Sequence, residues 1–230
     1  MTTITSRLKA VRDRLSAACK AAGRDPTSVR LLAVSKTFGD DAVVQAIAAG
    51  QLAFGENYIS EGVEKINALR QYAALEWHCI GPVQSNKTRL VAEHFDWVQS
   101  VDRLKIAQRL SEQRPRNLPP LQICLQVNVD GGTNKSGVAP GELMGLIREV
   151  IKLPHLRLRG LMTLPEPAID FAAACAVHSE ARALFDQVNS AGVLTEPMDT
   201  LSMGMTADLE AAIASGSTMV RVGTAIFGSR

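Results

Sequence analysis

A lysine stands at the end of an apolar segment near the start of the chain. Lys36 closes RLLAVSK (30–36), a run whose branched and apolar residues are typical of a buried β-strand. A lysine amine can condense with a carbonyl group to give an imine, and a strand end that opens into a binding site would expose the amine to such a carbonyl. The alternative is a lysine that only extends along the surface to reach water.

Two later segments have the composition of an anion site. LSMGMTADLE places Ser202 and Gly204 just before a predicted helix, and a glycine there lets the backbone approach an anion closely. MVRVGTAIFGSR reaches Gly223 and Thr224 at the end of a strand, and a short extra helix is predicted to follow. For the first segment, an ordinary strand-to-helix turn is the alternative.

Arg221 lies on the strand that leads to Gly223. Residues two apart on a strand point to the same side, so both are expected to face the same space. A guanidinium buried there needs a partner. Two partners are open: a carboxylate such as Asp199, or the ring nitrogen of a bound pyridine.

Two further segments supply polar side chains near predicted strand ends. FGENYISE places Asn57 directly after a strand, which favours a ligand-binding role, with a turn or helix-capping role as the alternative. HCIGPVQSNK contributes His78, Gln84 and Asn86. A histidine in such an apolar strand is expected to belong to the core, and this is our interpretation of His78.

Short β-rich runs alternate with amphipathic helical stretches, the pattern of repeated βα units around a parallel sheet. Eight strands are predicted, at 30–36, 52–57, 77–81, 97–101, 121–129, 156–163, 200–205 and 218–227. Eight such units form a (β/α)8 TIM barrel, in which working groups lie at the carboxyl ends of the strands. An open doubly wound sheet is the alternative, because one sequence does not reveal strand order.

Helix starts are indicated by Asp40, Asp41, Asp102 and Pro140. In TADLEAAIASG, Thr206 is the predicted N-cap, Asp208 lies in the first turn and Gly216 follows the last turn. Residues 1–24 have apolar residues at helical spacing and predict a surface helix packed on the barrel. We expect residues 1–230 to form a single domain.

The composition is that of an ordinary α/β protein, with 46% hydrophobic residues, 21% charged residues and a formal net charge of +2. The spread of charge favours a small-molecule partner over nucleic acid or a membrane. No apolar run approaches the roughly 20 residues needed to cross a bilayer. We expect a cytoplasmic monomer without a metal site, whose thiols are reduced. The cysteines have neither CxxC nor metal-ligand spacing and are Cys19, Cys79, Cys124 and Cys175.

Several short motifs occur in one order along the chain: AVSK, FGENY, HCIGPVQSNK, KSG, LSMGM and RVGTAIFG. Together they resemble the signature of the pyridoxal phosphate homeostasis protein family, which is similar to the amino-terminal barrel of alanine racemase. The resemblance extends from about Leu31 to Phe227. Cys79 and Val83 depart from the third motif, and both are apolar enough to leave a site intact.

The resemblance implies a cofactor, pyridoxal 5'-phosphate (PLP), held as a Schiff base on Lys36. It also implies the residues around PLP, with Arg221 facing the pyridine nitrogen, Asn57 beside the cofactor, and Ser202, Gly204, Gly223 and Thr224 around the phosphate. The implied role is intracellular PLP homeostasis, through buffering of PLP and its transient delivery to apo forms of PLP-dependent enzymes.

Arg221 bears on whether this site turns over a substrate. A guanidinium beside the ring nitrogen disfavours protonation of that nitrogen and weakens the ring as an electron sink. A two-base racemase needs a second base, and neither Tyr58 nor Tyr72 lies on a predicted strand opposite Lys36. Because the sequence ends at Arg230, we expect no second domain and no catalytic residues. The alternative is a lysine-imine enzyme, either PLP-dependent and acting on an amino acid or similar to a class I aldolase.

A second lysine lies in the glycine-rich segment GGTNKSG, after the fifth predicted strand. Lys135 is expected at the same barrel end as Lys36. The hypothesis is that its amine forms a transient imine with PLP that enters or leaves the site. A solvated loop lysine is the alternative.

Overall fold

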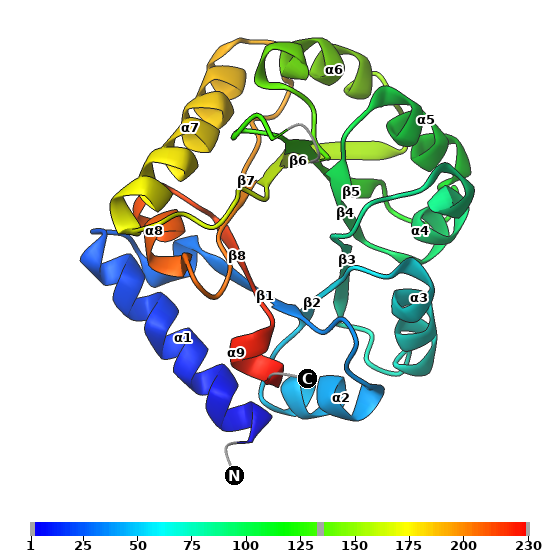
Figure 1. Ribbon diagram of the computed structural model, residues 1–230. Helices are drawn as coiled ribbons and strands as arrows, with labels where there is room; N and C mark the ends of the chain where they lie inside the picture. Colours follow the sequence, from blue (N-terminus) through cyan, green and yellow to red (C-terminus); the bar gives the residue numbers. More distant parts are fainter. Residues whose placement is uncertain (1–2, 133–135, 229–230) are drawn as a thin grey trace.

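In residues 3–132 and 136–228, which the computed structural model describes, eight parallel strands close into a barrel inside a ring of helices (Figure 1). Each strand pairs with its neighbours in sequence, and closure occurs where β8 pairs with β1, with Arg30 beside Met219 and Ala33 beside Val222. The predicted (β/α)8 barrel is confirmed, and the open-sheet alternative is wrong.

Six of the eight strands end earlier than predicted, and the other two, predicted at 97–101 and 156–163, end as predicted. Their bounds are β1 Arg30–Val34, β2 Ala53–Glu56, β3 Glu76–Cys79, β4 Trp97–Val101, β5 Leu121–Val127, β6 Leu156–Thr163, β7 Thr200–Ser202 and β8 Met219–Val222. The chain leaves β7 before Gly204, whose φ of 90° is left-handed, and leaves β8 before Gly223, where a short helix begins. The loops after these strands therefore shape the barrel mouth.

The helices alternate with the strands along the chain. Their bounds are α1 Ile4–Ala21, α2 Asp40–Ala48, α3 Ile59–Ala68, α4 Thr88–His94, α5 Leu104–Gln113, α6 Leu143–Val150, α7 Phe171–Ser190, α8 Leu209–Ala214 and α9 Thr224–Phe227, with short 3-10 helices at Pro26–Ser28, Ser85–Lys87 and Pro140–Glu142. The extra helix predicted near the end of the last strand is present as α9, whereas the predicted strand 218–227 is wrong beyond Val222, because residues 224–227 form this helix.

Helix α1 closes the outer ring beside this short last helix. It contacts α8, α9 and α2, and in Figure 1 it runs along the outside of the barrel between α8 and α2. Leu8, Val11 and Leu15 form its buried face, and the Thr3 hydroxyl caps it by accepting a hydrogen bond from the Ser6 N–H. Because α9 is only one turn long, α1 covers the part of the barrel that a longer helix after β8 would cover.

The predicted start of α8 is wrong. The helix begins at Leu209, and Asp208, rather than Thr206, is the residue that precedes it. One Asp208 oxygen accepts a hydrogen bond from the Met205 N–H at 2.6 Å, and the other lies 2.9 Å from Nε2 of His178 on α7. Asp208 therefore ties down the loop after β7, and Thr206 is left free to face the barrel mouth.

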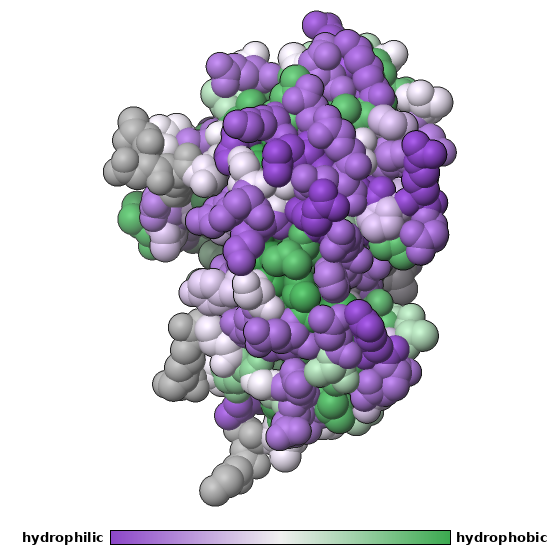
Figure 2. Space-filling view, turned by 90° about the vertical axis from the view of Figure 1, so that its right-hand side faces the viewer, coloured by the Kyte–Doolittle hydropathy of each residue, from purple (hydrophilic) through white to green (hydrophobic). Residues whose placement is uncertain are grey.

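The face of the molecule that carries α3, α4 and α5 is mostly polar. Figure 2 shows that the side formed by α3, α4 and α5 is largely hydrophilic, with only a small apolar strip near its middle. No helix in the described part of the chain is both long and apolar enough to span a membrane. The cysteines are unpaired, as predicted, and burial raises the pKa of Cys79 and of Cys124 to about 12.

Candidate functional site

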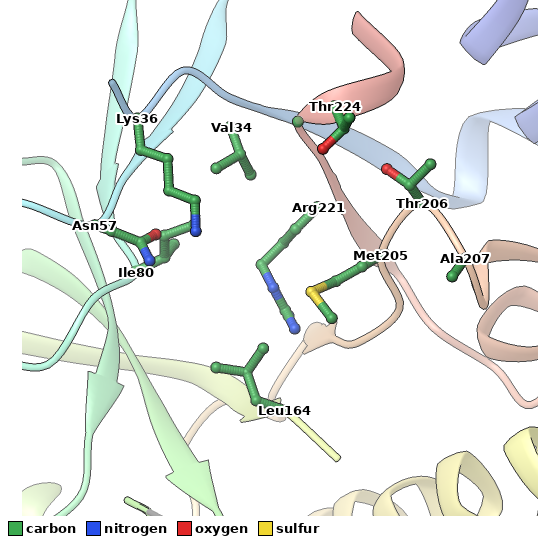
Figure 3. Close-up of a pocket in the computed structure, with 11 residues that line it drawn as sticks. Val34, Lys36, Asn57, Ile80, Leu164, Met205, Thr206, Ala207, Arg221 and Thr224 are labelled. Carbon is green, nitrogen blue, oxygen red and sulfur yellow. The ribbon is translucent and has the colours of Figure 1, made fainter. Parts of the chain in front are cut away.

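A pocket of about 330 Å³ lies at the carboxyl ends of the strands. Its apolar wall comes from Val34, Ile80, Leu164, Met205 and Ala207, and the rest of its lining from Lys36, Asn57, Thr206, Arg221, Gly223 and Thr224 (Figure 3). Lys36, Asn57, Arg221, Gly223 and Thr224 are thus brought together here from the predicted site, whereas Ser202 and Gly204 do not line the pocket.

Lys36 and Asn57 enter the pocket from adjacent strands. Lys36 lies two residues beyond the end of β1, and Asn57 directly follows β2. Figure 3 shows the Lys36 amine and the Asn57 amide close together and directed into the pocket. Lys36 is half-buried, so its amine is sheltered from bulk water but open to a small molecule.

Arg221 forms the floor of the pocket and is only 4% exposed. Its Nη1 donates a hydrogen bond to the Ser202 hydroxyl at 2.7 Å, and its Nη2 donates to the carbonyl oxygen of Thr163 at 2.8 Å. The predicted alternative partner, Asp199, pairs with Arg159 instead, so that alternative is wrong. Burial lowers the pKa of Arg221 to about 10.

A chain of hydrogen bonds continues from Arg221 through the barrel interior. The Ser202 hydroxyl donates to Oε1 of Gln99 at 2.6 Å, and the Gln99 amide lies 2.9 Å from Nδ1 of His78. Nε2 of His78 lies 2.7 Å from a carboxylate oxygen of Glu76. His78 is fully buried, as expected of a core histidine, and Ser202 serves this interior chain rather than the pocket wall.

The Glu76 end of the chain carries a negative charge at neutral pH. Burial would raise the pKa of Glu76, but the hydrogen bond with His78 and the charge of Arg30 lower it to about 2. Burial lowers the pKa of His78, which favours a neutral ring whose Nε2–H donates to Glu76. Gln99 can then donate to Nδ1, so every bond in the chain has a donor and an acceptor.

Two glycines near the pocket act differently. A Cβ atom on Gly223 would lie 3.1 Å from the Val34 carbonyl oxygen, so the glycine lets β8 pass close to β1 at the pocket wall. A Cβ on Gly204 would lie 2.3 Å from Cβ of Ala212, which places Gly204 against α8 rather than against the pocket. A second hydroxyl on the Thr224 side of the pocket belongs to Thr206, which the sequence predicts to be a helix cap.

The predicted rim residues lie beside the pocket. Gln84 and Asn57 line a neighbouring, shallower cleft together with Tyr58, and Asn86 lies in the 3-10 helix Ser85–Lys87. Lys135 lies outside the described residues, so its predicted role stays a hypothesis.

Comparison with known proteins places the chain in a family. The family model for the alanine racemase N-terminal domain matches residues 6–230. A pyridoxal phosphate homeostasis protein of Pseudomonas aeruginosa is 56% identical over 230 residues, which cover 100% of this chain and 97% of that protein. This chain belongs to the pyridoxal phosphate homeostasis protein family.

Solved structures agree with this membership. PipY of Synechococcus elongatus, in a structure described as having PLP bound, is 35% identical with a TM-score of 0.86, over 98% of this chain and 100% of PipY. Alanine racemase of Enterococcus (E. faecalis) is 19% identical with a TM-score of 0.71, over 100% of this chain and 59% of the racemase. The second likeness concerns the fold alone, and the predicted relation to the racemase barrel is confirmed by the family model.

Proposed function

We propose that this member of the homeostasis family binds PLP and holds it as a Schiff base on Lys36. The observation that carries the proposal is the meeting of a lysine amine, a buried guanidinium and a glycine–threonine turn in one pocket. These groups complement the aldehyde, the pyridine nitrogen and the phosphate of PLP. The name of the Pseudomonas relative and the PLP in PipY support the same ligand.

The pocket residues fit PLP part by part. Arg221 has five N–H donors, of which Ser202 and Thr163 take one each, so the guanidinium retains donors for a ring nitrogen. Thr224 and Thr206 offer hydroxyl groups to the phosphate, and Gly223 allows close backbone approach. When bound, PLP supplies an aldehyde, which condenses with the Lys36 amine with loss of water, and a conjugated ring.

We propose further that the protein stores PLP and passes it on in the cytoplasm without turning over amino acids. Among the described residues that line the pocket, Lys36 and Arg221 carry the ionisable side chains. Arg221 is protonated at neutral pH, because its pKa of about 10 lies well above 7. Proton transfer from the face opposite Lys36 would need a positioned acid within about 3 Å or one water away, and the described lining offers none.

Absorption and mass spectra test the binding mode. The untreated protein is expected to be yellow, and borohydride reduction should fix a pyridoxyl group on Lys36 that peptide mapping locates. A colourless protein that is trapped instead by a sugar phosphate would favour the class I aldolase-like alternative. A pyridoxyl group found only on another lysine would contradict the assignment of Lys36.

Isotope exchange tests the absence of turnover. Incubation with alanine or serine in deuterated water is expected to give no enantiomer formation above that of free PLP mixed with lysine. Robust racemisation or decarboxylation by the unmodified protein would instead support the PLP-dependent enzyme alternative. Transfer of PLP to an apo-enzyme, followed by the recovery of that enzyme's activity, measures the delivery step directly.

A further inference from the structure

A buried charged cluster lies directly behind Lys36. Nζ of Lys65, on α3, contacts carboxylate oxygens of Glu56 at 2.8 Å and of Glu61 at 2.6 Å. The side chain of Glu56 is 0% exposed and that of Lys65 is 5% exposed. None of these three residues lines the pocket, so the cluster has no direct part in holding a ligand there.

The cluster holds the residue that precedes Lys36 by both its side chain and its backbone. The Ser35 hydroxyl donates a hydrogen bond to Glu56 at 2.6 Å. Nζ of Lys65 donates to the Ser35 carbonyl oxygen at 2.7 Å. Ser35 is fully buried, so these bonds fix the peptide group that leads into Lys36.

The cluster also holds the residue that follows Lys36. Thr37 has a φ of 66°, in the left-handed region that branched residues rarely adopt, and it is the non-glycine residue with positive φ in the described part of the chain. The Thr37 N–H donates a hydrogen bond to the same Glu61 oxygen that contacts Lys65. A conformation of this kind is unfavourable for a branched residue and persists only where the surroundings fix it.

We propose that Glu56, Glu61 and Lys65 are positioning residues that set the direction in which the Lys36 side chain leaves the backbone. This inference rests on the proposed function, because a fixed direction matters only if the amine must meet an aldehyde in the pocket. Both backbone neighbours of Lys36 are bound by one rigid cluster, so the amine starts each encounter from a narrow range of positions. Correct placement of a reacting group lowers the entropic part of a reaction barrier.

The cost of burial favours this role over a purely stabilising one. Burial raises the pKa of Glu56, which reflects the penalty for a carboxylate away from water. No described group donates a hydrogen bond to the second oxygen of that carboxylate. Buried ion pairs of this kind are often no more stabilising than apolar side chains of similar volume. What this cluster provides is therefore a fixed backbone geometry on both sides of Lys36, more than added stability.

Two substitutions of Glu61 and one matched control test the proposal. Glu61 is partly exposed, so both Glu61→Ala and Glu61→Gln are expected to fold. The control is Gln51→Leu, because Gln51 is buried and joins the same two strands at their other ends by donating to the carbonyl oxygens of Leu31 and Ala53. Apo proteins are mixed with PLP, and the appearance of the imine absorption band is followed over a range of pH, alongside the thermal midpoint.

The rate of imine formation should separate positioning from stability. Glu61→Ala is expected to slow imine formation at least about ten-fold across the pH range, the scale of effect that misplacement of a reacting group produces. Glu61→Gln, which keeps an acceptor for the Thr37 N–H, should recover part of the rate. Gln51→Leu should lower the thermal midpoint but leave the rate unchanged.

The outcomes distinguish the inference from the function on which it rests. If the unmodified protein forms the band and Glu61→Ala forms it equally fast, the positioning role is wrong while PLP binding stands. A slowing in Gln51→Leu that matches the slowing in Glu61→Ala would likewise overturn it, because both would then report general loosening. If the unmodified protein forms no band, the proposed function and this inference fail together.

Discussion

Arg221 carries its charge between two neutral partners, the hydroxyl of Ser202 and the carbonyl oxygen of Thr163. In a dry interior, loss of either acceptor leaves an N–H group of the guanidinium without a partner. The Ser202 hydroxyl has a second task, because it also donates to Gln99. Ser202 and Arg221 therefore act on the cofactor site as one unit.

Replacement of Ser202 tests this unit. Ser202→Ala is expected to weaken PLP retention by about 1–3 kcal/mol, the range for a lost hydrogen bond to a charged group, because the guanidinium can then turn away from the ring nitrogen. Equilibrium dialysis with PLP measures the change. Ser100→Ala is the control, since Ser100 is also buried but donates its hydrogen bond to the carbonyl oxygen of Gly81. Equal affinities for Ser202→Ala and the unmodified protein would contradict the coupling.

The sequence indicated most of the pocket residues that lie outside its apolar wall, but not all of their roles. Lys36, Asn57 and Gly223 were predicted from their places next to strands, which is local information. Ser202 has the same local signal, yet its hydroxyl bonds to Gln99, which is 103 residues away. A contact at that separation is set by the closed barrel and leaves no trace in a short motif.

At the scale of elements, the packing of α8 against the end of β7 depends on one glycine. Gly204 has a φ of 90°, and a Cβ atom there would lie 2.3 Å from Cβ of Ala212 on α8. The left-handed conformation and the close approach both exclude a larger residue. This contact sets how near the loop with Met205 and Thr206 lies to the pocket.

Gly204→Ala is therefore expected to be strongly destabilising. Backbone strain and the clash with α8 each cost of order 1–3 kcal/mol, so the free energy of unfolding should fall by more than either alone. Gly192→Ala is the matched control, because Gly192 has a φ of 67° but open space around its Cα. Urea denaturation of both variants separates the clash from the strain, and equal losses would show that the contact with Ala212 relaxes freely.

Element number and order could be predicted from alternating patterns, whereas element ends could not. The start of α8 was misplaced because Thr206 has the features of a cap. In the structure, Asp208 takes that place while its carboxylate also contacts His178 on α7. The deciding partner lies on a different helix, so the helix start is a tertiary property.

At the scale of the whole molecule, a chain of polar side chains crosses the barrel interior from the pocket to Glu76. Glu76 is also bound by Arg30, at the amino-terminal end of β1. This series of hydrogen bonds thus connects a cation beneath the pocket, Arg221, to an anion toward the opposite end of the barrel, Glu76. The charge on Glu76 must therefore affect the free energy of unfolding of the whole barrel.

The acid side of the stability profile tests the charge on Glu76. The pKa of Glu76 is about 2 in the folded protein, below the ordinary value of 4.5. The stability that the ionised carboxylate contributes is therefore complete above pH 4.5 and is lost as the pH falls toward 2. Glu76→Gln should lower the free energy of unfolding at pH 7 by on the order of 1–3 kcal/mol, and the difference should shrink by pH 3.

Urea denaturation at the two pH values measures this difference. Glu196→Gln is the control, because Glu196 forms an exposed pair with Arg157 and should have little effect at either pH. A constant difference between Glu76→Gln and the unmodified protein from pH 7 to pH 3 would contradict the assigned pKa.

The pairing of β8 with β1 has a consequence for how the protein folds during its synthesis on the ribosome. Lys36 follows β1, and Arg221 lies on β8, so the two halves of the pocket come from the first and the last strand of the barrel. A nascent chain that lacks β8 has an open sheet edge and no floor for the pocket. PLP can then be captured only after β8 has been synthesised and has paired with β1. A ligand that binds only the closed barrel stabilises it by mass action. PLP binding therefore also stabilises the product of the last folding step, the pairing of β8 with β1.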